Sequence, residues 1–159
     1  MNKVDIKIRK ATIKDLNGIW VLVKKLINFF HELDNCYKSF SQRRSVEAFL
    51  RKTFKDKNTE IFIAEDNNII VGYIMVNVSK AQQMYSFNKL GSIWDVYVEK
   101  EYRKKGITKQ LLRESLKWFR LKKVKNINLS VDSKNLVGVK VWKKLGFLDR
   151  ENIMFMKLK

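Results

Sequence analysis

The chain has 159 residues, of which 45% are hydrophobic, and this length and composition suit one folded domain rather than a disordered segment. Its 34 lysines and arginines against 16 acidic residues give a net charge of +18, which indicates either an anionic partner or a lysine-rich surface without function, and disfavours a polycationic substrate. No apolar run reaches the ~20 residues of a membrane span, and the single Cys36 excludes an internal disulfide, so we expect a cytoplasmic protein that does not bind membranes.

The N-terminal third predicts one strand and two helices. Residues 4–9 alternate apolar and polar side chains, as a half-buried strand does. Thr12 and Asp15 resemble a capping box at the start of a helix. The apolar face of that helix consists of Leu16, Ile19, Trp20, Val23, Leu26, Ile27 and Phe30. A second helix is expected from about residue 45 to residue 54.

The apolar period then changes to that of strands. Residues 60–65 and 69–78 are rich in strand-forming side chains, and residues 66–68, Asp-Asn-Asn, suit a tight antiparallel hairpin between them. Residues 79–91 are polar and small and are interpreted as a loop. Residues 93–98 are the next expected strand.

The C-terminal part alternates helix and strand. Residues 108–120 form an amphipathic pattern, and the strand expected at residues 127–131 should pair in parallel with the one before that helix. A short helix at residues 136–145 ends at a glycine, and residues 147–158 suggest a last hairpin. The order predicts an α+β fold for a single domain over residues 1–159, with a mixed sheet of about six to seven strands and about four helices.

The turn between the strand at residues 93–98 and the next helix is a candidate phosphate site. A basic run with one glycine, residues 103–106, comes just before the helix N-terminus, where backbone N–H groups lack intrahelical partners. Neither a Rossmann glycine pattern nor a Walker loop occurs anywhere in the chain. The turn therefore predicts a phosphorylated ligand bound outside the common nucleotide folds.

Two motifs resemble those of the GNAT superfamily of acetyl-coenzyme A-dependent N-acetyltransferases. The sequence Arg-Lys-Lys-Gly-Ile-Thr at residues 103–108 is similar to the family's Arg/Gln-x-x-Gly-x-Gly/Ala turn. Residues 135–147, Asn-x-x-Gly-x-x-x-Trp-x-Lys-x-Gly-Phe, are similar to the family's Asn-x-x-Ala-x-x-x-Tyr-x-Lys-x-Gly-Phe. Their order and spacing, with the order of elements, imply a GNAT-like acyl-CoA N-acyltransferase fold and transfer of an acetyl group from acetyl-CoA to a primary amine.

The resemblance implies a set of cofactor-binding residues and no metal. The strand around Val96 and Val98 would bond the pantetheine arm as an added strand does, and the Val98 amide would stabilise the oxyanion. Asn135 would bind the cofactor's amide region, although it could equally cap the short helix. The remaining residues assigned to the cofactor are Arg103, Lys104, Lys105, Gly106, Ile107, Thr108, Trp142 and Lys144.

The sequence departs from the family pattern at residues that bear on catalysis. Thr108 replaces a glycine or alanine, and Trp142 replaces the tyrosine that protonates the departing thiolate in many members. An indole N–H is no useful general acid, so Trp142 could instead pack in the core. The thiolate would then leave unprotonated or take a proton from Tyr97 or water.

The catalytic base is expected at Asp95. The family often has Glu-Asp in this strand, where the chain has Trp94-Asp95. Strand alternation puts Asp95 on the face opposite Trp94, Val96 and Val98 unless a bulge redirects it. Weaker candidates for the base are Glu99 and Asp34, and His31 is interpreted as a helix-end residue.

The acceptor amine, a small molecule or a protein amine, is not identified by sequence. Its pocket is expected from residues 31–40 and 79–91. Two other functions stay open: a catalytically silent acyl-CoA sensor, and a basic protein bound to nucleic acid or ribosomes, for which residues 117–123 mix basic and aromatic side chains. A homodimer and an acidic macromolecular partner are also expected.

Overall fold

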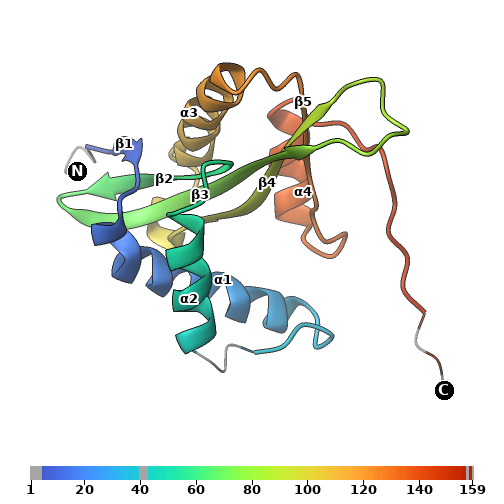
Figure 1. The fold of residues 1–159 in the computed structure, drawn as a ribbon. Coiled ribbons are helices and arrows are strands. Elements are labelled where there is room, and N and C mark those ends of the chain that lie inside the picture. The colour runs from blue at the N-terminus through green and yellow to red at the C-terminus, as the bar shows by residue number, and fades with distance from the viewer. Residues whose placement is uncertain (1–4, 40–42, 157, 159) are drawn as a thin grey trace.

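The computed structural model describes residues 5–39, 43–156 and 158, and shows a five-stranded sheet with helices on both faces (Figure 1). The strands lie in the order β1-β2-β3-β4-β5; all neighbours pair antiparallel except β4 and β5, which are parallel. The helices α1 and α2 cover one face, and α3 and α4 the other. The elements are β1 (Lys7–Lys10), α1 (Leu16–Leu33), α2 (Arg43–Thr53), β2 (Thr59–Asp66), β3 (Ile69–Lys80), β4 (Lys89–Val98), α3 (Ile107–Leu121), β5 (Asn126–Leu129) and α4 (Leu136–Lys144).

The predicted start of the first helix is confirmed. Thr12 and Asp15 form a capping box around a short 3-10 turn, from which α1 continues. One face of α1 is buried against the sheet, including Leu22, which the predicted stripe omits. The predicted first strand began at Val4, which lies outside the described residues.

The hairpin of β2 and β3 is confirmed, with Asn67 and Asn68 at positive φ angles of 48° and 64°. The predicted loop over residues 79–91 is wrong in extent. The strands β3 and β4 continue pairing out to Lys80 and Lys89, so only residues 81–88 connect them. Polar side chains at the solvated end of a long hairpin gave residues 79–91 the composition of a loop.

The predicted last hairpin is wrong for the described residues 147–156 and 158, which contain no strand. A strand needs a neighbour for its backbone hydrogen bonds, and this segment runs away from the sheet to the C-terminus (Figure 1). Its large apolar side chains beyond Phe147 are exposed, with Phe155 94% and Met154 91% accessible. The described sheet therefore has five strands instead of six to seven.

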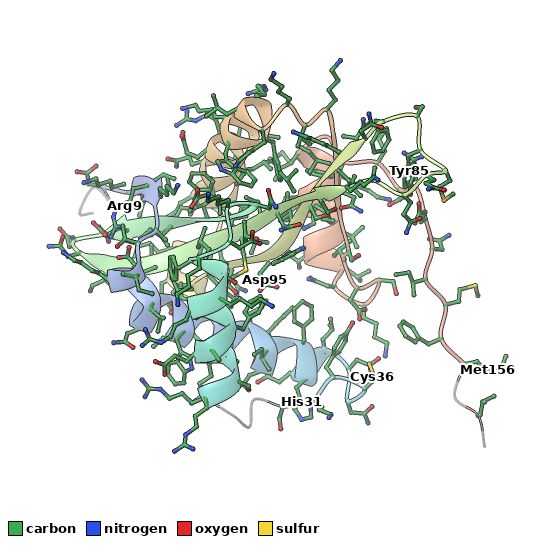
Figure 2. All side chains as sticks on the ribbon, in the orientation of Figure 1. Arg9, His31, Cys36, Tyr85, Asp95 and Met156 are labelled. Atoms are coloured by element: carbon green, nitrogen blue, oxygen red, sulfur yellow. The ribbon has the colours of Figure 1, made fainter. Side chains whose placement is uncertain are left out.

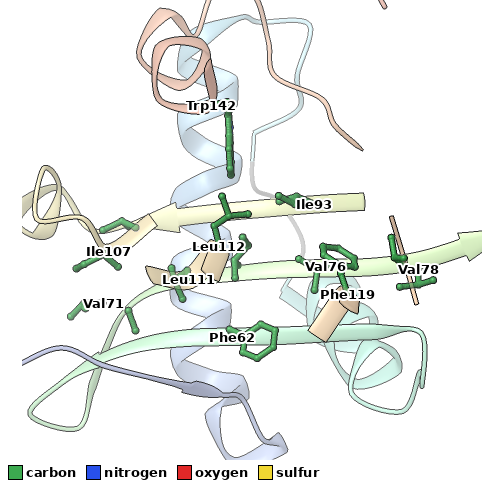
Figure 3. Close-up of a cluster of buried hydrophobic side chains, with 14 residues drawn as sticks. Phe62, Val71, Val76, Val78, Ile93, Ile107, Leu111, Leu112, Phe119 and Trp142 are labelled. Atoms are coloured by element: carbon green, nitrogen blue, oxygen red, sulfur yellow. The ribbon is translucent and has the colours of Figure 1, made fainter. Parts of the chain in front are cut away.

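Two hydrophobic cores lie on the two faces of the sheet. On the α3 side, Phe119, Leu111 and Trp142 pack on apolar side chains of β2, β3 and β4 (Figure 3). On the α1 side, Leu50 of α2 joins the buried stripe of α1 over the opposite side chains of the same strands. Because β4 contributes to both cores, it is held rigidly between the two layers of helices.

Candidate functional site

The strands β4 and β5 separate halfway along β4. Their parallel pairing runs from Leu90 opposite Asn126 to Ile93 opposite Leu129, and stops there. The rest of β4, through Val98, pairs only with β3. The β5-facing edge of β4 beyond Ile93 therefore has backbone groups that no strand in the described chain uses.

The Val98 amide points toward this open edge. The next amide, Glu99 N, donates to Val71 O on β3 at 2.9 Å. Because consecutive N–H groups in a strand point to opposite sides, the Val98 N–H is directed away from β3. The Val98 carbonyl on the same side accepts a 2.9 Å bond from Arg103 Nε. In the described chain, the Val98 N–H is thus a free hydrogen-bond donor at the end of the strand edge. It is the group predicted to stabilise the oxyanion.

The basic turn meets the N-terminus of α3 as predicted. Gly106 is the N-cap residue of α3, with φ of +77°, and no side chain caps the helix there. A Cβ built on Gly106 would meet nothing within 4 Å, so the glycine is required by its backbone angle, and the space above it is open. The first amides of α3 and the exposed Lys104 beside them can bind an anion.

The other predicted residues of this turn take different positions. The guanidinium of Arg103 lies over the Tyr97 ring at 5.6 Å, and the Lys105 ammonium lies 4.9 Å from the Tyr102 ring centroid. Ile107 is buried in the α3 core, and Thr108 is half-buried in the first turn of α3. Ile107 thus contributes its backbone amide to the turn, while its side chain anchors the helix.

A β-bulge in β4 puts Trp94 on the same face as Asp95, the face that α1 and α2 cover. Asp95 pairs with Met75 and Ile93 with Val76, which leaves Trp94 as the extra residue. Asp95 points away from Val96 and Val98, as alternation predicts, but Trp94 does not lie opposite Asp95. The Trp94 ring lies 6.3 Å from Phe49 of α2, on the same face as Asp95.

Asp95 lines a pocket of about 270 Å³ between α1 and α2, which we call the α1–α2 pocket. Figure 2 shows Asp95 on the side of the sheet that faces these two helices. The pocket is lined by Val23, Leu26, Ile27, Phe30, Ser45, Val46, Phe49 and Asp95. It does not coincide with the predicted acceptor segments, residues 31–40 and 79–91; the first of these ends at Phe40, which lies outside the described residues.

The Asp95 carboxyl has no hydrogen bond or ion pair within the described chain, and burial raises its pKa from 3.8 to about 6. Tyr73 pairs with Tyr97 while Met75 pairs with Asp95, so Tyr73 and Asp95 are diagonal neighbours on one face. The buried Tyr73 hydroxyl has no hydrogen-bond partner among the described residues. Burial, and then the Asp95 charge, raise the pKa of Tyr73.

The two weaker candidates for the base are already engaged in ion pairs. Glu99 is paired with Lys25, and Asp34 with Lys134. The hydrogen bond from Lys134 lowers the pKa of Asp34 to about 2, which makes this carboxylate a poor base. His31 Nδ1 lies 2.7 Å from the Tyr37 carbonyl just past the end of α1, in agreement with a helix-end role.

Tyr97, the predicted alternative acid, belongs to the α1-side core and is only 8% exposed. Burial, and then the Glu99 charge, raise the pKa of its hydroxyl. A phenol with a raised pKa holds its proton at neutral pH. Tyr97 can therefore donate a hydrogen bond more readily than it can give up the proton.

In the second motif, Asn135 caps α4, with its side chain accepting a 2.9 Å bond from the Gly138 amide. A Cβ on Gly138 would lie 2.5 Å from Asn135 Nδ2, so a larger residue at that position would require the capping side chain to shift. Trp142 is 7% exposed and packs edge-on against Phe147. These contacts support the capping and packing alternatives, while Lys144 is exposed at the end of α4.

Sequence reasoning missed most of the α1–α2 pocket. Val46 and Phe49 fall within the predicted second helix without a predicted role, and Phe49 is 44% exposed at the pocket. The one available signal was the number of apolar residues in this helix. Val46, Phe49 and Leu50 are all apolar, whereas the residues that α2 buries are Leu50 and Thr53. In the part of the chain that the structure describes, no group of three acidic, histidine or cysteine side chains could hold a metal ion, and no helix is long and apolar enough to cross a bilayer.

Solved structures share this fold. The aminoglycoside N-acetyltransferase AAC(6')-Iy in complex with CoA matches with a TM-score of 0.82 at 17% identity, covering 99% of this chain and 97% of that one. A predicted acetyltransferase from Clostridium acetobutylicum with acetyl-CoA matches with a TM-score of 0.78 at 20% identity, covering 96% of each chain. These likenesses confirm the predicted GNAT-like α+β fold.

Curated relatives and a family model match by sequence. N-alpha-acetyltransferases of Sulfurisphaera tokodaii and Saccharolobus solfataricus are 32% and 31% identical, over 62% of this chain and 62% of their own lengths. The model of the acetyltransferase (GNAT) family matches residues 26–147, which include both motifs and every residue that lines the α1–α2 pocket except Val23. Since this match covers most of the sequence, the chain belongs to the acetyltransferase (GNAT) family.

Proposed function

We propose that the chain, as one domain over residues 1–159, transfers an acetyl group from acetyl-CoA to a primary amine. The observation that carries the proposal is the position of β4. One edge of β4 offers the Val98 amide beside the α3 N-terminus, and one face presents Asp95 to a pocket. A thioester carbonyl on the edge and an amine in the pocket would meet at the same strand.

The residues around the open edge fit coenzyme A. The free side of Val96 and Val98 suits an extended amide chain, which would add to β4 as a strand does. The amides of α3 beyond Gly106, with Lys104 and Arg103 nearby, suit the pyrophosphate. Acetyl-CoA supplies the activated acetyl group, and the chain supplies the donors that orient it.

Asp95 would hold and deprotonate the incoming ammonium group. The neutral amine nitrogen then forms a bond to the acetyl carbon, the carbon–sulfur bond breaks, and its electron pair leaves on sulfur. The nitrogen loses two protons: one passes to Asp95 and on to solvent, and the other passes to solvent directly. Solvent then returns one proton to the departing sulfur. The Val98 N–H would donate to the carbonyl oxygen as negative charge develops there.

Protonation of sulfur would not come from Trp142, which is buried among apolar side chains. Tyr97 would not protonate the sulfur either, because its raised pKa makes its hydroxyl a weaker acid. We propose that the thiolate leaves unprotonated and takes its proton from solvent. The names of the two relatives support an α-amine as the acceptor.

Two measurements test the activity. Acetyl-CoA at millimolar concentration should raise the melting temperature of the purified protein, and amines should then release free thiol. Absence of both effects would exclude the proposal. Stabilisation by acetyl-CoA without thiol release from any amine would identify an acyl-CoA sensor instead.

We also propose a homodimer formed through the C-terminal segment in a cytoplasmic protein. The support for the dimer is the exposed apolar run, which includes Ile153 and Phe155, together with β5, a sheet edge with no further described partner. Met156 marks how far this run extends from the body in Figure 2. The single, exposed Cys36 suits a reducing compartment, and the +18 charge suits an acidic partner.

Light scattering tests the dimer. The full chain should have twice the monomer mass, and a chain ending at Arg150 should be monomeric while it keeps its stabilisation by acetyl-CoA. A monomeric full chain would exclude this interface.

A further inference from the structure

We infer that the α1–α2 pocket selects a primary amine that carries one apolar substituent, such as a peptide whose first residue is leucine, methionine or phenylalanine. The substituent would occupy the apolar part of the pocket, with the amine beside Asp95. This inference rests on the proposed acetyl transfer and adds the class of acceptor to it.

The lining of the pocket favours an apolar group. Six of its eight lining residues are aliphatic or aromatic, contributed by one face of α1 and one face of α2. Burying an apolar side chain there releases water from both surfaces and stabilises the complex in proportion to the area covered. A polar or charged first residue would lose its hydration against these side chains without a hydrogen-bond partner from them.

The size of the pocket limits the substituent. Its volume of about 270 Å³ is just below the ~300–1,000 Å³ that is usual for small-molecule sites. This space suits one side chain and an amine, but not a substrate of several linked rings. The pocket therefore differs in scale from what an aminoglycoside requires.

The charges around the pocket favour a single amine. Asp95 is the one acidic residue that lines it. The nearest acidic residue on α2, Glu47, is paired with Arg51 at 2.8 Å and Arg43 at 3.8 Å. Asp34, just past the end of α1, is paired with Lys134. One unpaired carboxylate can receive one ammonium group, whereas a polycation would leave its other charges without partners.

The chain's net charge of +18 adds to this discrimination. A substrate with several positive charges is repelled over about a Debye length, which is ~8–10 Å at physiological ionic strength. A peptide N-terminus carries a single positive charge and pays little of this cost. Pocket and overall charge thus point to the same class of acceptor.

The test compares peptides that differ only in the first residue. Leucine, methionine and phenylalanine peptides should be acetylated with kcat/KM about 10- to 100-fold above those of glycine, aspartate and lysine peptides, which is the range expected for burying a few carbon atoms. Product mass should show the acetyl group on the α-amine. Equal rates for all first residues, or faster acetylation of an aminoglycoside than of the leucine peptide, would overturn the inference and leave acetyl transfer standing.

Two variants on α2 test whether the pocket causes the preference for an apolar first residue. Val46→Phe fills it and should remove most of the preference for leucine over glycine. Ala48→Phe adds the same ring at an exposed position on the same helix that does not line the pocket, and should keep the preference. Stabilisation by acetyl-CoA should be the same in both variants. Loss of the preference in both, or in neither, would overturn the assignment, whereas loss of the acetyl-CoA effect in the unmodified chain would overturn the proposed function itself.

Discussion

The candidate sites on the two sides of β4 consist of different chemical groups. On the β5 side, the groups that would bind coenzyme A are mainly backbone amides, at Val98 and at the start of α3. On the α1 side, the pocket consists of side chains from the consecutive helices α1 and α2 and from β4, which is distant from them in sequence. The backbone site depends on strand geometry and one glycine, while the pocket depends on which side chains the helices present.

The two kinds of site respond differently to substitutions. A site of backbone donors tolerates changes in side chains, so it can keep one ligand across a whole family. A pocket of side chains changes with each substitution, so it can change the acceptor without disturbing the cofactor. Each of the following substitutions affects one side of β4 and should leave the other intact.

The largest effect is expected from Asp95→Asn on the pocket side. Without a base, kcat/KM should fall by about 100- to 10,000-fold, while binding of acetyl-CoA stays within twofold. In the unmodified protein, log kcat/KM should rise with pH up to about 6, the raised pKa of Asp95, and then level off as far as this group is concerned. A pH profile without this acidic limb would contradict the role of Asp95.

The same variant should be more stable at neutral pH. The folded protein binds the Asp95 proton more tightly than the unfolded chain does, because burial raises its pKa to about 6. The contribution of this group to stability is therefore complete below about pH 4 and is lost as pH rises through about 6. Asn carries no charge, so Asp95→Asn should raise the free energy of unfolding at pH 7.5 by about 1–3 kcal/mol, as measured by urea denaturation.

On the cofactor side, Gly106→Val should weaken binding of acetyl-CoA by at least about tenfold, since a branched side chain crowds the anion site and strains the positive φ angle. Gly146→Val is the matched control, because Gly146 also has a positive φ angle and open space around it but follows α4. Both variants should lose stability, and calorimetry should show weakened binding in Gly106→Val alone. Equal weakening in the two would mean that strain, and not the turn, determines affinity.

Trp142→Phe tests whether Trp142 only packs in the core or also contacts the cofactor. The smaller ring leaves a gap in the α3-side core, which should cost about 1–3 kcal/mol in chemical denaturation. Because Trp142 is buried there, kcat/KM and acetyl-CoA affinity should stay within about twofold. A tenfold loss of affinity without loss of stability would instead place the indole against the cofactor, as the family motif implies.

The smallest effect is expected from Asn135→Ala. Loss of the bond to the Gly138 amide removes the N-cap of α4 and should lower the free energy of unfolding by about 1 kcal/mol. Asn135→Ser restores a capping oxygen and should recover most of this loss. A fall in acetyl-CoA affinity that serine does not recover would show that Asn135 also contacts the cofactor.

Local sequence patterns were sufficient to predict several features of the structure. The capping box of Thr12 and Asp15, the Asn67-Asn68 hairpin and the glycine at the start of α3 each follow from the conformational preferences of a few neighbouring residues. The two motifs and the order of elements were sufficient to predict the family and the fold. The prediction of a last hairpin was wrong because apolar alternation shows that a segment could pair as a strand, but not that a free strand edge lies next to it.

The placement of two candidate sites on β4 depends on contacts between distant parts of the chain. The bulge at Trp94 has no sequence signature, because it is set by the pairing of β4 with β3, and it puts Trp94 and Asp95 on the same face. The pocket exists because α1 and α2 pack on that face at a distance that leaves space around Asp95. The raised pKa of Asp95 follows from the same packing, since burial is a property of the surroundings and not of the residue.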